Sequence, residues 1–118
     1  MDMDRFFKTL EAIYRAEGPF AYTLKEYRAV FRYFFDRYEQ ERGEKHPPIK
    51  WAQTLKIMEA MPYIDRTEYV HGDYRDIEPD EYPAIIDKYF DTPFKRCDYR
   101  INHFFSGDVR TMRIYELQ

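Results

Sequence analysis

The sequence predicts a mainly α-helical protein, a compact bundle of four to five helices in a single domain spanning residues 1–118. Apolar side chains recur every three to four residues along most of the chain, which is the spacing of one helix face. Prolines and glycines separate these stretches and end the helices. The apolar content is rich in rings, with 12 tyrosines and 10 phenylalanines. A chain of this length can bury a core without disulfide bonds.

The first predicted helix runs from about Asp4 to Ala16. Its apolar side chains follow the i, i+3, i+4, i+7 spacing of one buried face, and Gly18-Pro19 ends it because proline cannot continue a helix. The side chains on this face are Met3, Phe6, Phe7, Leu10, Ile13 and Tyr14.

The second predicted helix, Leu24 to Arg42, is the best-defined element and the expected centre of the fold. Thr23 and Glu26 form a T-x-x-E capping box, in which each side chain accepts a hydrogen bond from a free backbone N–H at the helix start. Gly43 is the expected C-terminal stop. The apolar stripe consists of Leu24, Tyr27, Val30, Phe31, Phe34, Phe35 and Tyr38.

A third helix is predicted from about Ile49 to Met61, between the two prolines of the GEKHPPI loop and Pro62. A fourth is predicted from Pro79 to Phe90, with Pro83 in its first turn, where proline is tolerated. The third helix is expected to bury Trp51, Leu55, Met58 and Met61, and the fourth Tyr82, Ile85, Ile86, Tyr89 and Phe90.

Two segments are ambiguous. Residues 67–77 (TEYVHGDYRDI) fit either a short β-hairpin or an ordered loop, because a Gly-Asp pair is flanked by Tyr and Val. The C-terminal segment, CDYRINHFF and VRTMRIYEL, fits either a hairpin or two short helices capped by Ser106 or Asp108. We favour helices there, because Phe104, Val109 and Met112 fall at helical spacing.

Charge is unevenly distributed along the chain. Residues 59–91 hold 10 acidic and 3 basic groups, although the net charge of the whole chain is only −3. Carboxylates interleaved with tyrosines attract a basic partner and then offer it flat contact area, whereas the alternative is a solvated face that keeps the protein soluble. The expected partner-binding residues are Tyr69, Asp73, Tyr74, Asp76, Glu78, Asp80, Glu81 and Tyr82.

An alternative function is nucleic-acid binding through arginines of the second helix and the C-terminal segment. The signal is weak because the protein is acidic overall. The arginines in question are Arg28, Arg32, Arg96, Arg100, Arg110 and Arg113. A minor alternative is a HEPN-like ribonuclease, because Arg66 and His71 have the Arg-x4-His spacing of such enzymes.

No catalytic residue, metal site or cofactor is expected. The three histidines, His46, His71 and His103, are far apart in sequence, and the single serine has no base beside it. Cys97 is the only cysteine and is expected to be partly buried. The scarcity of cysteine, with no secretory signal or membrane span, predicts an intracellular, cytoplasmic protein.

Two stretches carry a resemblance to a known group of proteins. YFFDRYEQERGEKHPPI, residues 33–49, and CDYRINHFFSGDVRTMRIYE, residues 97–116, resemble small uncharacterised proteins of phages and conjugative elements of Gram-positive bacteria. The resemblance implies a role in anti-defence or in element replication and implies no catalytic residues. With the acidic stretch, it suggests an inhibitor of the anti-CRISPR or anti-restriction type whose partner is a basic bacterial protein, such as a nucleic-acid enzyme.

Overall fold

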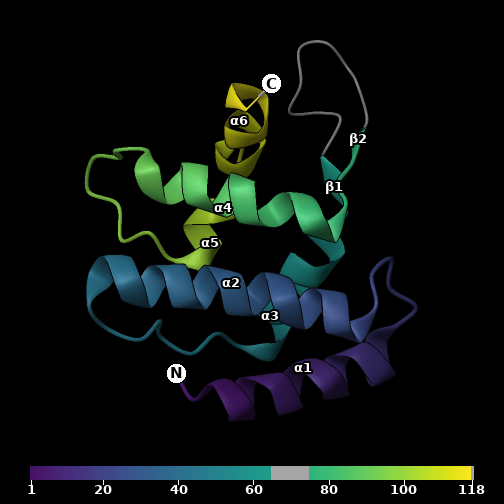
Figure 1. The fold of residues 1–118 in the computed structure, drawn as a ribbon. Coiled ribbons are helices and arrows are strands. Elements are labelled where there is room, and N and C mark those ends of the chain that lie inside the picture. The colour runs from purple at the N-terminus through teal and green to yellow at the C-terminus, as the bar shows by residue number, and fades with distance from the viewer. Residues whose placement is uncertain (65–74, 118) are drawn as a thin grey trace.

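The protein is mainly helical, as the sequence predicts, and Figure 1 shows its fold. The structure is a computed structural model that describes residues 1–64 and 75–117. In chain order the elements are α1 (Met3–Glu17), α2 (Leu24–Arg42), α3 (Trp51–Ala60), β1 (Tyr63–Ile64), β2 (Arg75–Asp76), the 3₁₀-helix η2 (Pro79–Glu81), α4 (Tyr82–Asp91), α5 (Ile101–Phe104) and α6 (Val109–Glu116). No helix in these described ranges is long and apolar enough to cross a membrane.

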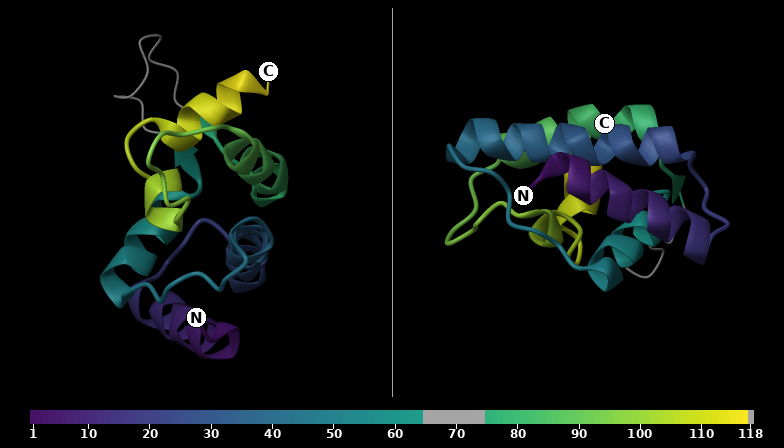
Figure 2. Two further views of the ribbon diagram at one scale, coloured as in Figure 1. Left: turned by 90° about the vertical axis from the view of Figure 1, so that its left-hand side faces the viewer. Right: turned by 90° about the horizontal axis from the view of Figure 1, so that it is seen from below.

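Helix α2 lies at the centre of the fold, with α1 on one side and α4 on the other (Figure 1). α1 runs antiparallel to α2, whereas α2 and α4 run in the same direction. The two views of Figure 2 show α3, α5 and α6 completing the bundle beside these three helices. Helices α1 to α5 all contribute large side chains that are fully buried. These include Leu10, Tyr27, Phe31, Phe34, Met58, Tyr82, Tyr89 and Phe104.

The second helix has the predicted bounds, Leu24–Arg42, and the predicted caps. The Glu26 N–H donates to Thr23 Oγ1 at 3.2 Å, and the Thr23 N–H donates to Glu26 Oε1 at 2.8 Å. Gly43 follows with a φ of 71°, and its N–H donates to the Glu39 carbonyl. Because a side chain is strained at this φ, glycine is the residue that can stop the helix there.

Removing the cap of α2 tests how much it contributes. We expect Thr23→Ala to lower the free energy of unfolding by about 1 kcal/mol, because the Glu26 N–H loses its acceptor. Urea denaturation followed by circular dichroism measures the change. Thr23→Ser keeps the hydroxyl and is expected to stay close to the wild-type value. Equal destabilisation by the two substitutions would contradict a capping role.

The third helix starts later than expected, and its buried face is rotated from the predicted one. Trp51, expected in the core, is 42% exposed at the first residue of α3. Met58 and Met61 are buried as predicted, and Thr54 and Ile57 are buried beside them. The Thr54 hydroxyl donates to the Lys50 carbonyl at 2.9 Å. This local hydrogen bond satisfies the Thr54 hydroxyl. A threonine can therefore occupy a core position for which the apolar spacing predicts a larger apolar residue.

The structure describes the ambiguous C-terminal segment up to residue 117 but only three residues of the other ambiguous segment. The C-terminal segment forms helices α5 and α6, as favoured, although Met112 is exposed on α6. β1 and β2 form one antiparallel pair, with Tyr63 opposite Asp76 and Ile64 opposite Arg75. Of the predicted 67–77 hairpin or loop, only residues 75–77 lie within the described residues.

Candidate functional site

A groove of about 630 Å³ lies between the first half of α2 and the segment formed by η2 and the start of α4. We call it the acidic groove. Helix α2 contributes one wall through residues one turn apart, and Pro79 at the start of η2 and Pro83 in the first turn of α4 form part of the other. Its lining residues are Lys25, Glu26, Ala29, Val30, Tyr33, Glu78, Pro79, Asp80 and Pro83.

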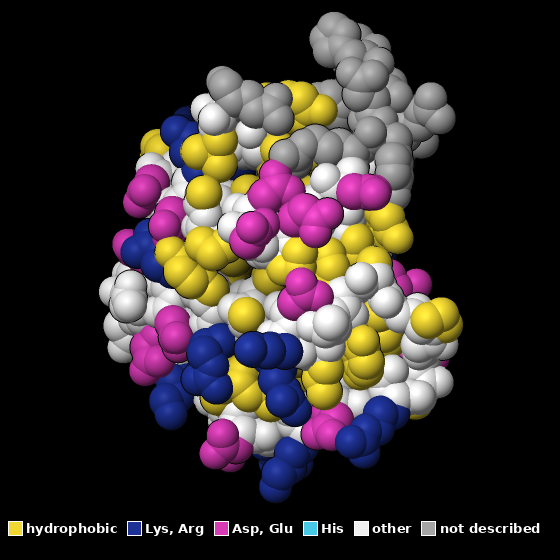
Figure 3. Space-filling model, turned by 45° about the vertical axis from the view of Figure 1, so that its right-hand side comes forward, with side chains coloured by type: hydrophobic (Ala, Val, Ile, Leu, Met, Phe, Trp, Pro, Cys, Tyr) yellow, Lys and Arg dark blue, Asp and Glu magenta, His cyan; other side chains and the backbone are white. Residues whose placement is uncertain are grey.

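The charge of the groove is concentrated on its η2 side. Glu78 and Asp80 line it and are exposed, and Asp76 is exposed on the adjoining strand β2. Their position is fixed locally, because Pro79 begins η2 and the Glu78 N–H donates to Glu81 Oε2 at 2.7 Å. Figure 3 shows carboxylate side chains gathered beside hydrophobic ones on this face, with Lys and Arg side chains collected separately below them.

The α2 wall is mostly apolar and is held in place by the core. Val30 is only 4% exposed, whereas Ala29 beside it is open to solvent. The Tyr33 hydroxyl donates to the Asp87 carboxylate of α4 at 2.8 Å, and Arg37 Nε lies 3.0 Å from the same carboxylate. Burial and then Asp87 raise the pKa of Tyr33, so its hydroxyl stays a neutral donor.

The structure brings together part of the predicted partner-binding set. Asp76, Glu78 and Asp80 are exposed near one another. Glu81 is half-buried, and its carboxylate caps η2. Tyr69, Asp73 and Tyr74 lie outside the described residues, as do Arg66 and His71 of the ribonuclease alternative.

Tyr82 was predicted to contact a partner, and this prediction is wrong. Its side chain is 0% exposed, and its hydroxyl donates to the Met61 carbonyl. Burial raises the pKa of Tyr82 to about 12. The ring follows the buried stripe of α4, and the hydroxyl can be buried because a carbonyl at the end of α3 accepts its proton.

The Met61 carbonyl is the centre of a buried polar cluster. It accepts hydrogen bonds from the hydroxyls of Tyr22 and Tyr82, and the Tyr22 hydroxyl also donates to the Ile77 carbonyl. Arg110 Nη1 donates to the Tyr82 hydroxyl at 2.8 Å. We call these four residues, Tyr22, Met61, Tyr82 and Arg110, the Met61 hub.

Arg110 was predicted as a nucleic-acid contact, but the structure places it in the core with 7% exposure. Its Nη1 donates to the Ala60 carbonyl and its Nη2 to the Tyr63 carbonyl, each at 2.7 Å. Carbonyls at a helix C-terminus lack intrahelical partners and carry partial negative charge. The guanidinium therefore caps the end of α3, which explains why a cation is buried there.

The other predicted arginines do not form one surface with Arg110. Arg113 is also 7% exposed, and its Nη2 lies 2.6 Å from Glu116 Oε1. Arg28 lies near Glu11, and Arg32 stacks over the Phe7 ring at 4.8 Å. Of the remaining two, Arg96 is exposed, and Arg100 is exposed with its Nε 3.4 Å from Asp98 Oδ2. The burial of two of the six members contradicts the predicted common nucleic-acid surface.

Cys97 has a neighbouring histidine that the sequence did not reveal. Its Sγ lies 3.2 Å from His103 Nδ1, and the Tyr89 hydroxyl lies 2.7 Å from the same nitrogen. The Tyr99 N–H donates to the sulfur at 3.1 Å. The fold therefore places an imidazole beside this thiol. His103 follows six residues later, in α5, and only the fold brings the two side chains together.

The residues of the α2 wall are not among the site residues predicted from the sequence. Their signal is the spacing of Glu26, Ala29, Val30 and Tyr33, which places them on a face next to the main buried stripe. This spacing shows a shared face but not the empty space in front of it. Within residues 1–64 and 75–117, no three His, Cys, Asp or Glu side chains are placed to hold a metal ion.

Comparison with known proteins finds no relative of this chain. No protein-family model, curated protein or solved structure matches this chain.

Proposed function

We propose that this protein is a non-enzymatic binding module that engages a basic region of another protein through the acidic groove. The observation that carries this proposal is the combination of exposed carboxylates and apolar wall in one concave site. Glu78 and Asp80 stand beside Val30 and Pro83 there.

The charge of the groove favours a cationic partner. Glu26, Glu78 and Asp80 are acidic and only Lys25 is basic among its lining residues. Exposed carboxylates of one sign speed the encounter with an oppositely charged surface and disfavour acidic competitors. Nucleic acid, whose backbone is anionic, is therefore a poor ligand for this groove.

The apolar wall indicates how such a partner is held after the encounter. A lysine or arginine side chain has an aliphatic stem that packs on apolar surface while its charged end stays near carboxylates. Ala29 and Pro83 offer the apolar surface and Asp80 the charge. We therefore expect the occupant to be a protein segment in which basic and apolar residues alternate.

Proteins that bind DNA or RNA display basic grooves of this kind, and a protein bound there competes with the nucleic acid. The proposed role is therefore inhibition of a nucleic-acid-binding protein. The resemblance to phage and conjugative-element proteins favours an anti-CRISPR or anti-restriction inhibitor.

Charge reversal tests the proposal. We expect Asp76→Lys, Glu78→Lys and Asp80→Lys together to abolish capture of nucleic-acid-binding proteins from a bacterial lysate, because the groove then repels them. Excess DNA is expected to release the proteins that the wild-type chain captures. Glu81 is left intact because its carboxylate caps η2.

A matched control changes the net charge by the same amount elsewhere. Asp36, Glu39 and Glu44 are exposed and lie outside the groove, so their reversal to lysine is expected to leave capture unchanged. Equal loss of capture by both triple variants would indicate a general charge effect. Captured proteins that DNA does not displace would contradict the competitive mechanism.

A further inference from the structure

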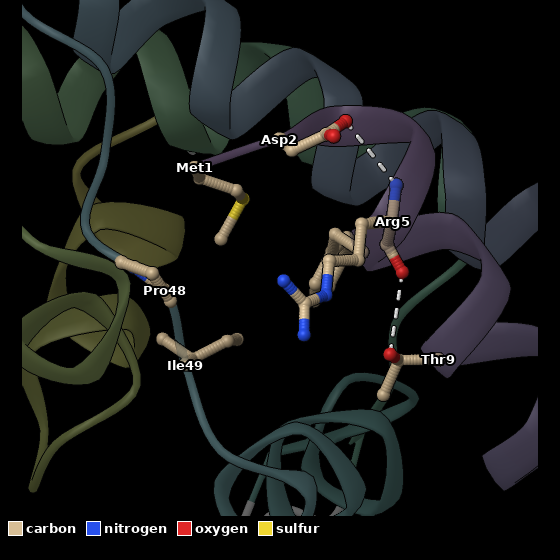
Figure 4. A pocket seen from close by; sticks show the side chains of 7 residues that line it. Met1, Asp2, Arg5, Thr9, Pro48 and Ile49 are labelled. Atoms are coloured by element: carbon tan, nitrogen blue, oxygen red, sulfur yellow. Dashed lines mark hydrogen bonds between the residues drawn. The ribbon is translucent and has the colours of Figure 1, made fainter.

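A second pocket, of about 350 Å³, lies between the beginning of α1 and the loop that precedes α3. We call it the Arg5 pocket. Its apolar lining comes from Met1, Phe6, Pro48 and Ile49. Figure 4 shows the Arg5 guanidinium pointing into the space between Met1, Ile49 and Thr9. The site therefore combines an apolar wall with the Arg5 guanidinium and, at its edge, the Asp2 carboxylate.

The Arg5 guanidinium has no hydrogen-bond or ion-pair partner within the described part of the chain. Asp2 lines the same pocket, but its Oδ1 accepts from the backbone N–H groups of Asp4, at 3.0 Å, and Arg5, at 3.3 Å. The Thr9 hydroxyl donates to the Arg5 carbonyl at 3.2 Å. Both polar neighbours are thus bonded to the helix backbone, and the guanidinium donors remain available to a ligand.

The walls of the Arg5 pocket are held by the core. Phe6 is 6% exposed, and its ring packs edge-on against Phe31, with centroids 5.1 Å apart. The loop carrying Pro48 and Ile49 is fixed by buried His46. Its Nδ1 lies 2.7 Å from the Pro47 carbonyl, and its Nε2 accepts from the Ile101 N–H at 3.0 Å. The pocket is therefore preformed, which lowers the entropy cost of binding.

We propose that the Arg5 pocket binds a small monocarboxylic acid with a short apolar body. A guanidinium pairs with a carboxylate through two parallel hydrogen bonds, as it also does with a phosphate, whose second negative charge Asp2 disfavours. The apolar walls cover the body of the ligand. The volume lies at the small end of the roughly 300–1,000 Å³ typical of ligand pockets, which excludes a bulky ligand. A dicarboxylate is disfavoured because Asp2 adds a negative charge.

Titration with octanoate tests the proposal by NMR, with the amide signals of Thr9 and Ile49 as local probes. We expect both signals to shift with wild-type protein, and 1-octanol, which lacks the carboxylate, to bind about tenfold more weakly or worse. Arg5→Met removes the cation and keeps a good helix former, so octanoate affinity is expected to fall by a similar factor. Lys8→Met removes an exposed cation of the same helix outside the pocket and is expected to keep wild-type affinity.

Three results would overturn the proposal. One is equal octanoate affinity of wild type and Arg5→Met, and another is equal loss in Arg5→Met and Lys8→Met. The third is binding of a short peptide through its C-terminal carboxylate with no binding of octanoate. The test is independent of the acidic groove, because neither variant alters a groove residue.

Discussion

Replacing Arg110 by methionine is expected to lower the free energy of unfolding by about 4 kcal/mol, the largest effect of any single substitution considered. Methionine fills similar apolar space but donates no hydrogen bonds. The carbonyls of Ala60 and Tyr63 then lose a charged donor, and the Tyr82 hydroxyl loses its contact with the cation. Hydrogen bonds from charged groups contribute about 1.5–3 kcal/mol each, and an unpaired buried acceptor costs a similar amount. Urea denaturation at neutral pH measures the change.

Arg113→Met is the matched control for this experiment. Arg113 is buried to the same extent as Arg110, at 7% exposure, but its Nη2 pairs with the half-exposed carboxylate of Glu116. We expect a loss of about 1 kcal/mol or less, because a partly exposed ion pair contributes little. If the two substitutions destabilised the protein equally, the loss at Arg110 would reflect burial of the side chain and not its contacts with the end of α3.

The stability of the protein is expected to fall by about 3 kcal/mol between pH 6.5 and pH 4 because of His46 alone. Burial lowers the pKa of His46 from 6.5 to about 4. Above pH 6.5 the imidazole is neutral in both states, so this group contributes no pH dependence. Below that pH the unfolded chain binds a proton that the folded state resists, and stability declines by about 1.4 kcal/mol per pH unit. Below pH 4 both states are protonated and the decline from this group ends.

The contacts of His46 explain why the fold resists the proton. Nε2 accepts the Ile101 N–H at 3.0 Å and therefore has no lone pair free for a proton. The ring lies among Phe34, Phe35 and Tyr38, at centroid distances of 4.7–6.1 Å. Protonation would remove one hydrogen bond and leave a charge among aromatic rings.

The measurement is a series of urea denaturations of wild type and His46→Asn at pH values from 4 to 7. Carboxylates contribute to acid sensitivity in both proteins, so the difference between the two curves isolates His46. We expect the curves to converge as the pH falls, because the variant has no imidazole to protonate. Parallel curves across this range would show that His46 titrates alike in the folded and unfolded states.

The helices could be predicted from the sequence where spacing and caps agree. Helix α2 is the clearest case, because Thr23, Glu26 and Gly43 fix its ends and its stripe fixes its buried face. In helix α3 the apolar spacing predicts only part of the buried face. Thr54 can be buried because its hydroxyl donates to the Lys50 carbonyl, and apolar periodicity does not report such a hydrogen bond.

The candidate site could be predicted only in part. Asp76, Glu78 and Asp80 were found because charge runs are visible in a sequence. The groove beside them depends on the distance between α2 and η2, which is a property of tertiary packing. Tyr82 and Arg110 were misassigned for one reason: residue type alone does not show whether a buried carbonyl lies within reach.

The Met61 hub also bears on the order of folding events. Its other members are residues 22, 82 and 110, which are 39, 21 and 49 positions from Met61. Contacts so distant along the chain form only after the intervening segments have been brought together, at a cost in loop-closure entropy. We therefore expect the hub to form after the barrier to folding has been crossed. Interactions that are not yet formed in the transition state slow unfolding more than they speed folding. We therefore expect the hub to act mainly on the unfolding rate, and so on the lifetime of the native state.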